Sequence, residues 1–375
     1  MSKSWATSER LERVPGGPAG ALLDVRDLHV TFRAQRGLVH AVNGLSFSVA
    51  PGEVLGIVGE SGSGKSVAMN SVMGLLGRQN VEVSGTANFR DVDLLSLDDR
   101  RLRSIRGKEI AMIFQDPMTA LTPVYTVGWQ IVEQLRAHQH ISRRAASKRA
   151  VELLDEVGIP DPAHRVDNFP HEFSGGMRQR AMIAMALSCD PSLLIADEPT
   201  TALDVTTQAQ VLDLLRQLRD THGSSIVLIT HDMGVISEIA DRVVVMYAGQ
   251  AMEVGPRRSV IRSPRHPYTW GLLGAIPRPS TRGKMLATIP GAPVSPMNLP
   301  PGCPFAPRCR YRLDECDEQP PLLGAEHLDA CWLPRADRRE LRETIYTGED
   351  ATPDKIGDPG PGDEPSEDGP RRERA

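Results

Sequence analysis

The stretch from Val54 to Ser66, VLGIVGESGSGKS, joins a short apolar run to a glycine-rich loop. Gly59, Gly64, Lys65 and Ser66 match the spacing G-x-x-x-x-G-K-S of a phosphate-binding loop. The run before the loop is strand-like, and the sequence after it keeps apolar residues at helical spacing. Backbone N–H groups of such a loop and the N-terminus of the following helix converge on one anion. The stretch therefore predicts a polyphosphate site between a strand and a helix.

Each residue of this loop has an expected part in holding a nucleotide. Ser61, Gly62 and Ser63 lie inside the loop and are expected to contact the phosphates together with Gly59 and Gly64. Lys65 is expected to reach the β- and γ-phosphates, and Ser66 to offer its hydroxyl to Mg²⁺. A glycine-rich turn that matches by chance is the alternative, and the strand-like and helix-like flanks disfavour it.

Composition is that of an ordinary globular chain. The 375 residues have a net charge of −5, with 40% hydrophobic and 24% charged residues, which allows one large α/β domain with an appendage or two domains. Nothing in this balance points to nucleic acid as a partner. No window approaches the ~18 apolar residues of a membrane span, and the N-terminal sequence lacks a signal-peptide core. We expect a cytoplasmic chain whose membrane role depends on partners.

Hydrophobic patterning predicts an α/β fold built from several parts. Residues 22–32 and 40–49 alternate apolar and polar side chains, as half-buried antiparallel strands do. The continuous apolar runs in 192–198 and 224–230 are typical of buried parallel strands, and a helical pattern separates them. A hairpin is expected to turn at Ala248–Gly249, and a strand to end at Gln115. These patterns predict a doubly wound parallel core.

The same patterning divides the chain into four segments. We expect a flexible leader over 1–21 and a nucleotide-binding domain over 22–260, with a helical subdomain inserted at about 117–185. A proline-rich module with little regular structure is expected over 261–335. Charge runs alternating with Pro and Gly predict a disordered tail over 336–375.

Two further motifs carry candidate chemistry. Asp197 and Glu198 follow a buried strand, where one carboxylate is suited to a Mg²⁺ shell and the next to polarising an attacking water. Ser174, Gly175 and Gly176 open a helical run, where they are suited to binding a second phosphate surface. The simpler alternatives are a pair of exposed loop acids and an ordinary helix cap.

Together these motifs resemble an ATP-binding cassette protein over about Leu22 to Val254, in order and approximate spacing. The resemblance implies that Glu198, His231 and Gln115 serve catalysis, with His231 on the γ-phosphate and Gln115 on Mg²⁺ or the attacking water. Asp197 would complete the Mg²⁺ shell with Ser66. The sequence FSGGMRQR departs from the commoner LSGGQ but keeps its Ser and glycines.

The resemblance also implies how two cassettes share nucleotide. They meet head to tail, so that ATP lies between the phosphate loop of one and Ser174, Gly175 and Gly176 of the other. Asp204 would contact the partner cassette, although it is equally suited to a helix N-cap. Adenine would stack on Phe32 of the first strand.

Three stretches are similar to the dipeptide and oligopeptide importer branch: residues 115–131, 263–277 and 300–309. The similarity implies an ATPase at the cytoplasmic face of the cell membrane, working with two membrane-spanning permeases, an extracytoplasmic peptide-binding protein and a second cassette. Residues 117–135 would help to form the groove for a permease. Nickel or another small solute is the alternative cargo. A soluble ATPase acting on DNA or ribosomes, and a regulatory module that senses iron or oxygen, are the rival functions.

Four of the five cysteines, Cys303, Cys309, Cys316 and Cys331, lie in one stretch with the spacing C-x₅-C-x₆-C-x₁₄-C. Disulfides are rare in cytoplasmic chains, so this stretch indicates a metal site. The spacing lacks the C-x₂-C pairs of common zinc sites, and four thiolates are suited to either Zn²⁺ or a [4Fe–4S] cluster. Members of the importer branch with such cysteines resemble cluster carriers. We therefore expect a [4Fe–4S] cluster, with zinc or unligated thiols as alternatives.

Overall fold

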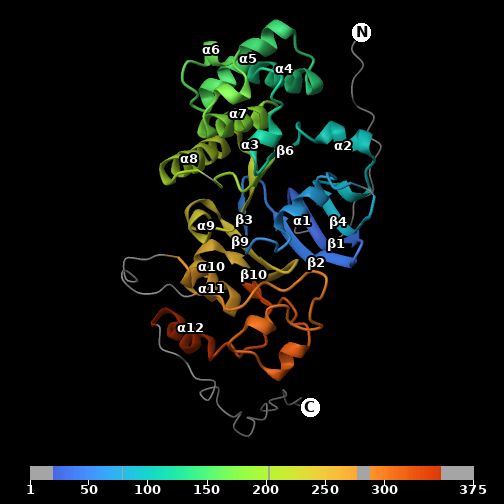
Figure 1. Ribbon diagram of the computed structural model, residues 1–375, viewed down its shortest axis with the longest axis vertical. Helices are drawn as coiled ribbons and strands as arrows, with labels where there is room; N and C mark the ends of the chain where they lie inside the picture. The colour runs from blue at the N-terminus through green and yellow to red at the C-terminus, as the bar shows by residue number, and fades with distance from the viewer. Residues whose placement is uncertain (1–19, 78, 202, 277–287, 348–375) are drawn as a thin grey trace, which may run out of the picture.

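A seven-stranded sheet forms the centre of the computed structural model, which describes residues 20–77, 79–201, 203–276 and 288–347 (Figure 1). Its strand order is β11-β10-β9-β3-β8-β7-β6. The strands are β3 (Val54–Val58), β6 (Ile110–Ile113), β7 (Leu193–Asp197), β8 (Ser225–Thr230), β9 (Arg242–Tyr247), β10 (Gln250–Pro256) and β11 (Leu328–Asp329). The five strands β6, β7, β8, β3 and β9 are parallel, which confirms the predicted parallel core.

A second, antiparallel sheet packs beside the first. It has the order β2-β1-β4-β5, with β1 (Leu23–Ala34), β2 (Gly37–Val49), β4 (Val81–Phe89) and β5 (Val92–Asp93). Helix α1 (Lys65–Val72) contacts β1 and β2, and its buried Ala68 and Met69 share one core with Leu55 and Ile57 of β3. A short 3₁₀ turn, η1 (Leu94–Ser96), and α2 (Asp99–Ile105) follow β5. The phosphate loop thus lies where the two sheets meet.

The helices of the predicted inserted subdomain form a lobe of their own at the top of Figure 1. They are α3 (Pro117–Ala120), α4 (Val127–His138), α5 (Arg143–Glu156), α6 (Pro162–Arg165) and α7 (Gly175–Leu187), with the 3₁₀ turn η2 (Pro170–Glu172) before α7. Thr126, Ser142 and Ser174 cap α4, α5 and α7 by accepting a hydrogen bond from a backbone N–H in the first turn. Strand β6 ends at Ile113, two residues before the predicted end at Gln115.

The remaining helices flank the core and build the C-terminal module. They are α8 (Val205–His222), α9 (Met233–Ile239), α10 (Arg257–Arg262), α11 (Pro267–Gly274) and α12 (Arg338–Thr347), with 3₁₀ turns η4 (Ala306–Arg308) and η5 (Asp314–Asp317). The expectation of little regular structure over 261–335 was wrong where α11 forms, whereas most of α10 lies before this range. Disorder from residue 336 was also wrong where α12 forms. The rest of the predicted tail, 348–375, and residues 1–19 of the predicted leader lie outside the described residues.

The C-terminal module shares its core with the cassette. Strand β11 pairs with β10, so the module adds a strand to the main sheet. The rings of Tyr247, Tyr268 and Phe305 pack together, with centroids 4.8 to 5.4 Å apart. Burying three aromatic rings from β9, α11 and the cysteine stretch couples the module firmly to the cassette. The hairpin between β9 and β10 turns at Ala248–Gly249, both with positive φ, as the sequence predicts.

Candidate functional site

The phosphate loop is shaped by glycines that no other residue can replace. A Cβ on Gly59 would lie 2.1 Å from the carbonyl oxygen of Met246, and one on Gly64 would lie 2.3 Å from that of Ala41. Gly64 also has φ of +96°, in the left-handed region that favours glycine. The backbones of β2 and β9 therefore press against the loop from two sides. This close packing fixes the curvature that turns its N–H groups inward.

Lys65 lies inside the loop and is almost fully buried. Its Nζ donates to the carbonyl oxygens of Gly59 at 2.8 Å and Glu60 at 2.9 Å, and to Ser63 Oγ at 3.4 Å. Burial lowers the pKa of Lys65, and the nearby carboxylates of Glu198, Asp197 and Glu60 oppose this. A buried ammonium group of this kind gains most from an added anion. Lys65 is thus placed to meet a phosphate.

Ser66 and Asp197 are far apart in the sequence and meet at the mouth of the loop. Ser66 Oγ donates to Asp197 Oδ1 at 2.9 Å, across 131 residues of sequence. Burial raises the pKa of Asp197, helped by the charge of Glu198 and opposed by the Ser66 bond and Lys65. A hydroxyl and a carboxylate side by side form the donor set that Mg²⁺ prefers.

Glu198 has the most polar contacts of the acidic residues at this site. Its Oε2 accepts from Gln115 Nε2 at 3.0 Å and Thr201 Oγ1 at 2.8 Å, and its Oε1 lies 3.3 Å from His231 Nδ1. The residue has φ of +47°, a conformation uncommon outside glycine. Its backbone N–H donates to Ile229 in β8 at 2.9 Å, which holds this conformation. The structure thus brings all three predicted catalytic residues together.

The environment of Glu198 favours its ionised form. Burial works to raise the pKa of this carboxyl, but the hydrogen bonds of Thr201 and His231 and the charges of His231 and Lys65 outweigh burial and lower it. Its side chain is 11% exposed, so a water molecule has only a narrow approach. Glu198 is therefore an ionised carboxylate that can accept a proton from a water held beside the loop.

Ser174, Gly175 and Asp204 are exposed, and they lie away from the phosphate loop of their own chain. Ser174 caps α7 and Asp204 caps α8, and both α7 and α8 stand well apart from α1 in Figure 1. The two helix starts are neighbours, because a Cβ on Gly176 would lie 3.1 Å from Thr207 Cγ2. Val205, beside Asp204, is 84% exposed. These two helix starts therefore form an exposed edge that lies apart from the phosphate loop of the same chain.

Phe32 lies on β1, partly buried against the core shared by the two sheets. It pairs with Val39 of β2, two residues before the Ala41 carbonyl that touches the phosphate loop. The contacts place this ring on the strand next to the loop, and its role in adenine stacking stays a prediction.

Several residues of the site carry no sequence signal of their own. Thr201 does have a sequence signal, because it lies three residues after Glu198, a spacing that allows a side-chain hydrogen bond across a turn. Arg308 pairs with Glu60 and Tyr268 accepts from the Glu60 N–H at 2.8 Å, but 248 and 208 residues separate them from that position. Asn43 donates to Ala248 at 3.0 Å and holds the hairpin beside the loop.

The four clustered cysteines face one small apolar cavity. Cys303, Cys309, Cys316 and Cys331 line it together with aromatic and proline side chains, while Cys189 lies elsewhere. Burial raises the pKa of Cys309 and of Cys331 to about 12, so the free thiols are protonated at neutral pH. Within the described ranges, no three His, Cys, Asp or Glu side chains converge closely enough to hold a metal ion.

Comparisons with known proteins agree with this geometry. A family described as "ABC transporter" matches residues 42–201, and one described as "Oligopeptide/dipeptide transporter, C-terminal region" matches residues 252–316. The chain is 51% identical to the dipeptide transport ATP-binding protein DppD of Bacillus subtilis, covering 83% of this chain and 94% of that protein. It is 50% identical to the oligopeptide transport ATP-binding protein OppD of Salmonella typhimurium, covering 84% and 95%.

A solved structure extends the likeness to three dimensions. The ATP-binding cassette MJ0796, in a dimeric post-hydrolysis state bound to ADP and Pi, matches with a TM-score of 0.57 and 27% identity, over 63% of this chain and 99% of that one. The structural match shows the fold of an ATP-binding cassette, and the phosphate loop and the Glu198 site are consistent with ATP hydrolysis. This chain belongs to the ATP-binding cassette transporter family, among the ATPase subunits of its dipeptide and oligopeptide branch.

Proposed function

We propose that this chain hydrolyses ATP to energise the import of dipeptides or oligopeptides through a membrane permease. The observation that carries the proposal is the Glu198 carboxylate, held by Gln115, Thr201 and His231 beside a complete phosphate loop. The relatives that are half identical over most of the chain are dipeptide and oligopeptide transport proteins by name, which supports the cargo. Nickel or another small solute is the alternative cargo.

Hydrolysis follows from the positions of these side chains. The loop N–H groups and Lys65 bind the phosphates, and Ser66 and Asp197 would hold Mg²⁺, which when bound neutralises charge on the β- and γ-phosphates. Gln115 and His231 flank the Glu198 carboxylate and orient it toward the γ-phosphate. Glu198 accepts a proton from the attacking water as the water oxygen bonds to the γ-phosphorus, while the bond from the γ-phosphorus to the β–γ bridging oxygen breaks and that oxygen leaves with ADP. ADP and phosphate are the products.

The exposed edge at Ser174 and Asp204 calls for a second cassette. One chain leaves this edge without a phosphate, so we propose that ATP lies between the loop of one cassette and Ser174, Gly175 and Gly176 of another. ATP would bridge the two surfaces, and its hydrolysis would remove the bridge. The dimeric state of the structurally similar MJ0796 cassette supports this arrangement.

An apolar patch beside Gln115 is suited to a permease. Val124, Tyr125 and Trp129 are 37 to 71% exposed, and the Tyr125 and Trp129 rings stack 4.0 Å apart. Phe114, the neighbour of Gln115 in the sequence, is 39% exposed. Exposed apolar groups gathered in this way mark an interaction surface. No described helix is long and apolar enough to span a bilayer. We propose that two permeases dock here and hold the chain at the cytoplasmic face of the membrane, supplied by an extracytoplasmic peptide-binding protein.

We also propose that the cysteine cavity holds a [4Fe–4S] cluster. Four cysteine sulfurs around one apolar cavity are the donor set of such a cluster. Zn²⁺, which four thiolates can also bind, is the alternative. Cys303, Cys309, Cys316 and Cys331 would bind the cluster as thiolates, so binding would release their protons. Such a cluster supplies structural cross-linking or redox sensing.

The test is purification of the tagged chain with its partners, kept anaerobic, from detergent-solubilised membranes. We expect two multi-span permeases, a second cassette and a peptide-binding protein, and ATPase activity that peptide stimulates. Glu198→Gln in this complex should lower turnover by a factor of about 10² to 10⁴ while ATP still binds. Glu238→Gln, an exposed glutamate on α9, is the matched control. Recovery with ribosomes or DNA instead, or stimulation by nickel alone, would contradict the proposed cargo.

A further inference from the structure

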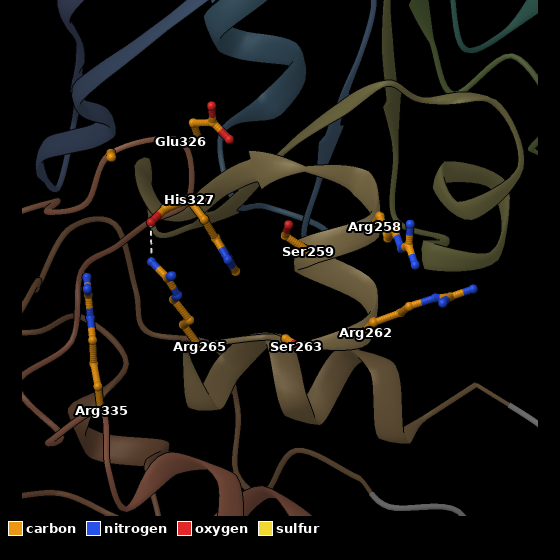
Figure 2. Close-up of a pocket in the computed structure, with 9 residues that line it drawn as sticks. Arg258, Ser259, Arg262, Ser263, Arg265, Glu326, His327 and Arg335 are labelled. Carbon is orange, nitrogen blue, oxygen red and sulfur yellow. Dashed lines mark hydrogen bonds between the residues drawn. The ribbon is translucent and has the colours of Figure 1, made fainter.

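A basic pocket of about 850 Å³ lies on the C-terminal module, between α10 and the loop before β11 (Figure 2). Arg258, Arg262, Arg265 and Arg335 line it with Ser259 and Ser263, and Glu326 is the one acidic residue in its lining. Figure 2 shows Arg258 and Arg262 on one side and Arg265 and Arg335 on the other. A second pocket shares Arg265 and Arg335 and adds Arg338, Arg339 and Arg342 from α12. We call the two together the arginine cleft.

Carboxylates behind the cleft neutralise only part of its charge. The buried Asp329 serves three guanidinium groups: it pairs with Arg338, and its Oδ1 lies 3.3 Å from Arg335 and 3.8 Å from Arg265. The buried Glu253 accepts from His327 Nε2 at 2.7 Å and faces away from solvent.

At the rim of the cleft, Arg258 and Arg262 are exposed and have no acidic partner among the described residues. The first pocket therefore gathers four arginines around one lining carboxylate, Glu326, with Asp329 shared behind Arg265 and Arg335. A cleft with this excess of positive charge attracts an anionic partner.

The sequence carries an acidic segment shortly after the last described helix. Helix α12, whose arginines line the second pocket, ends at Thr347. Residues 349–368 then contain eight acidic residues and one lysine: Glu349, Asp350, Asp354, Asp358, Asp363, Glu364, Glu367 and Asp368, against Lys355. Asp358 lies eleven residues past Thr347, so at up to ~3.5 Å per residue an extended chain lets it reach about 38 Å from the end of α12. Charge and reach therefore match the cleft.

We propose that the arginine cleft is the binding site of the acidic segment 349–368 of the same chain. Carboxylates of the segment pair with Arg258, Arg262 and Arg335, whose planar guanidinium groups bind carboxylates in a bidentate manner. Tethering at Thr347 raises the effective concentration of the segment to the millimolar range, which compensates for the modest strength of each exposed pair. The bound segment excludes other polyanions from the cleft.

The experiment places the photo-crosslinking residue benzoylphenylalanine at Asp358 in the full chain. We expect intramolecular crosslinks to residues 257–265 and 325–335, with a yield that falls as salt rises toward 1 M. Arg258→Ala with Arg262→Ala should lower the yield about fivefold or more, because both side chains are exposed and support no internal contact. Arg100→Ala with Arg103→Ala, also exposed on one helix, is the matched control.

A second readout uses a fluorescent ten-residue glutamate peptide as the probe. The full chain should bind it weakly, and a chain with its five acids from Asp358 to Asp368 changed to Asn or Gln should bind it at least tenfold more tightly. Adding Arg258→Ala and Arg262→Ala to that variant should abolish the tighter binding of the peptide.

Three results would overturn the proposal. The first is crosslinking elsewhere, and the second is crosslinking that survives loss of Arg258 and Arg262. The third is crosslinking found only between isotopically light and heavy chains, which would assign the cleft to a second copy. Inorganic pyrophosphate that binds the full chain at the cleft, undisturbed by the acidic segment, would likewise show a phosphate site instead.

Discussion

The Arg308 guanidinium holds the Glu60 carboxylate by two hydrogen bonds, from Nη1 to Oε2 at 2.6 Å and from Nη2 to Oε1 at 3.1 Å. Glu60 belongs to the phosphate loop, and Arg308 directly precedes Cys309 of the cysteine cavity. The Tyr268 hydroxyl accepts from the Glu60 backbone N–H at 2.8 Å, so side chains of the C-terminal module hold both the backbone and the side chain of this residue. The module is thus part of the support of the nucleotide site.

Replacing Arg308 should therefore disturb ATP binding from outside the loop. Arg308 is buried and Glu60 is a quarter exposed, so Arg308→Ala leaves a poorly solvated carboxylate and should lower the free energy of unfolding by about 2–3 kcal/mol. The loosened loop should raise KM for ATP more than it lowers kcat. Chemical denaturation and steady-state kinetics measure both quantities.

Arg312 provides the control for this prediction, because it forms an exposed ion pair with Asp317 in the same module. Arg312→Ala should change stability by less than about 1 kcal/mol and leave KM as it is. Equal KM values for the Arg308 and Arg312 variants would show that the ion pair does not support the phosphate loop.

We expect Thr201 to influence the pH at which kcat falls on the acid side, through the pKa of Glu198. Its hydroxyl donates to the Glu198 carboxylate and lowers the pKa of that group, so Thr201→Val should raise this pKa. The acid limb of kcat should then move to higher pH, whereas kcat at neutral pH, where the carboxyl is ionised in both proteins, should change much less. Thr201→Ser keeps the hydroxyl and should restore the profile. An acid limb at the same pH in the valine variant would refute this positioning role.

We expect the ionised Asp197 side chain to lower the thermal stability of the chain when no Mg²⁺ is bound. Burial raises its pKa above the ordinary value of 3.8, so the folded state disfavours the ionised form that is present at neutral pH. Asp197→Asn should raise the Tm of the nucleotide-free chain at pH 7 by a few degrees, while ATPase activity falls. The Tm gap should close as the pH drops below the ordinary value, where both side chains are neutral. Exposed Asp213→Asn should not raise Tm, and a lower Tm for Asp197→Asn would contradict the prediction.

Cysteine substitution distinguishes the three possible states of the cavity. We expect the anaerobically purified chain to absorb visible light and to contain about four irons. Cys309→Ser should lose both, whereas Cys189→Ser should keep them because Cys189 lies outside the cavity. One zinc per chain would support the zinc alternative, and a chain that takes up neither metal would mean unligated thiols.

Local patterns in the sequence determine most of the cassette. The phosphate loop, the buried parallel strands, the hairpin at Ala248–Gly249 and the acids after β7 each follow from residues close together in the chain. Their roles can be read because each motif depends on backbone geometry a few residues long. The same approach failed for α11 and α12. Helix α11 begins with Pro267 and buries Tyr268 and Trp270, and Leu341 of α12 packs against the cluster around Trp270, so tertiary contacts support both short helices.

Contacts across long stretches of sequence were decided only by the tertiary structure. Sequence placed Glu60 and Arg308 in separate domains, and nothing in either segment indicates that they pair. The gathering of seven arginines at the arginine cleft likewise depends on α10, α12 and the loop before β11 meeting at one place. Sequence alone therefore identified the candidate catalytic groups, because their motifs are local. Only the tertiary structure determined which distant residues support these groups, such as Arg308 on Glu60, because a buried ion pair forms wherever packing brings opposite charges together.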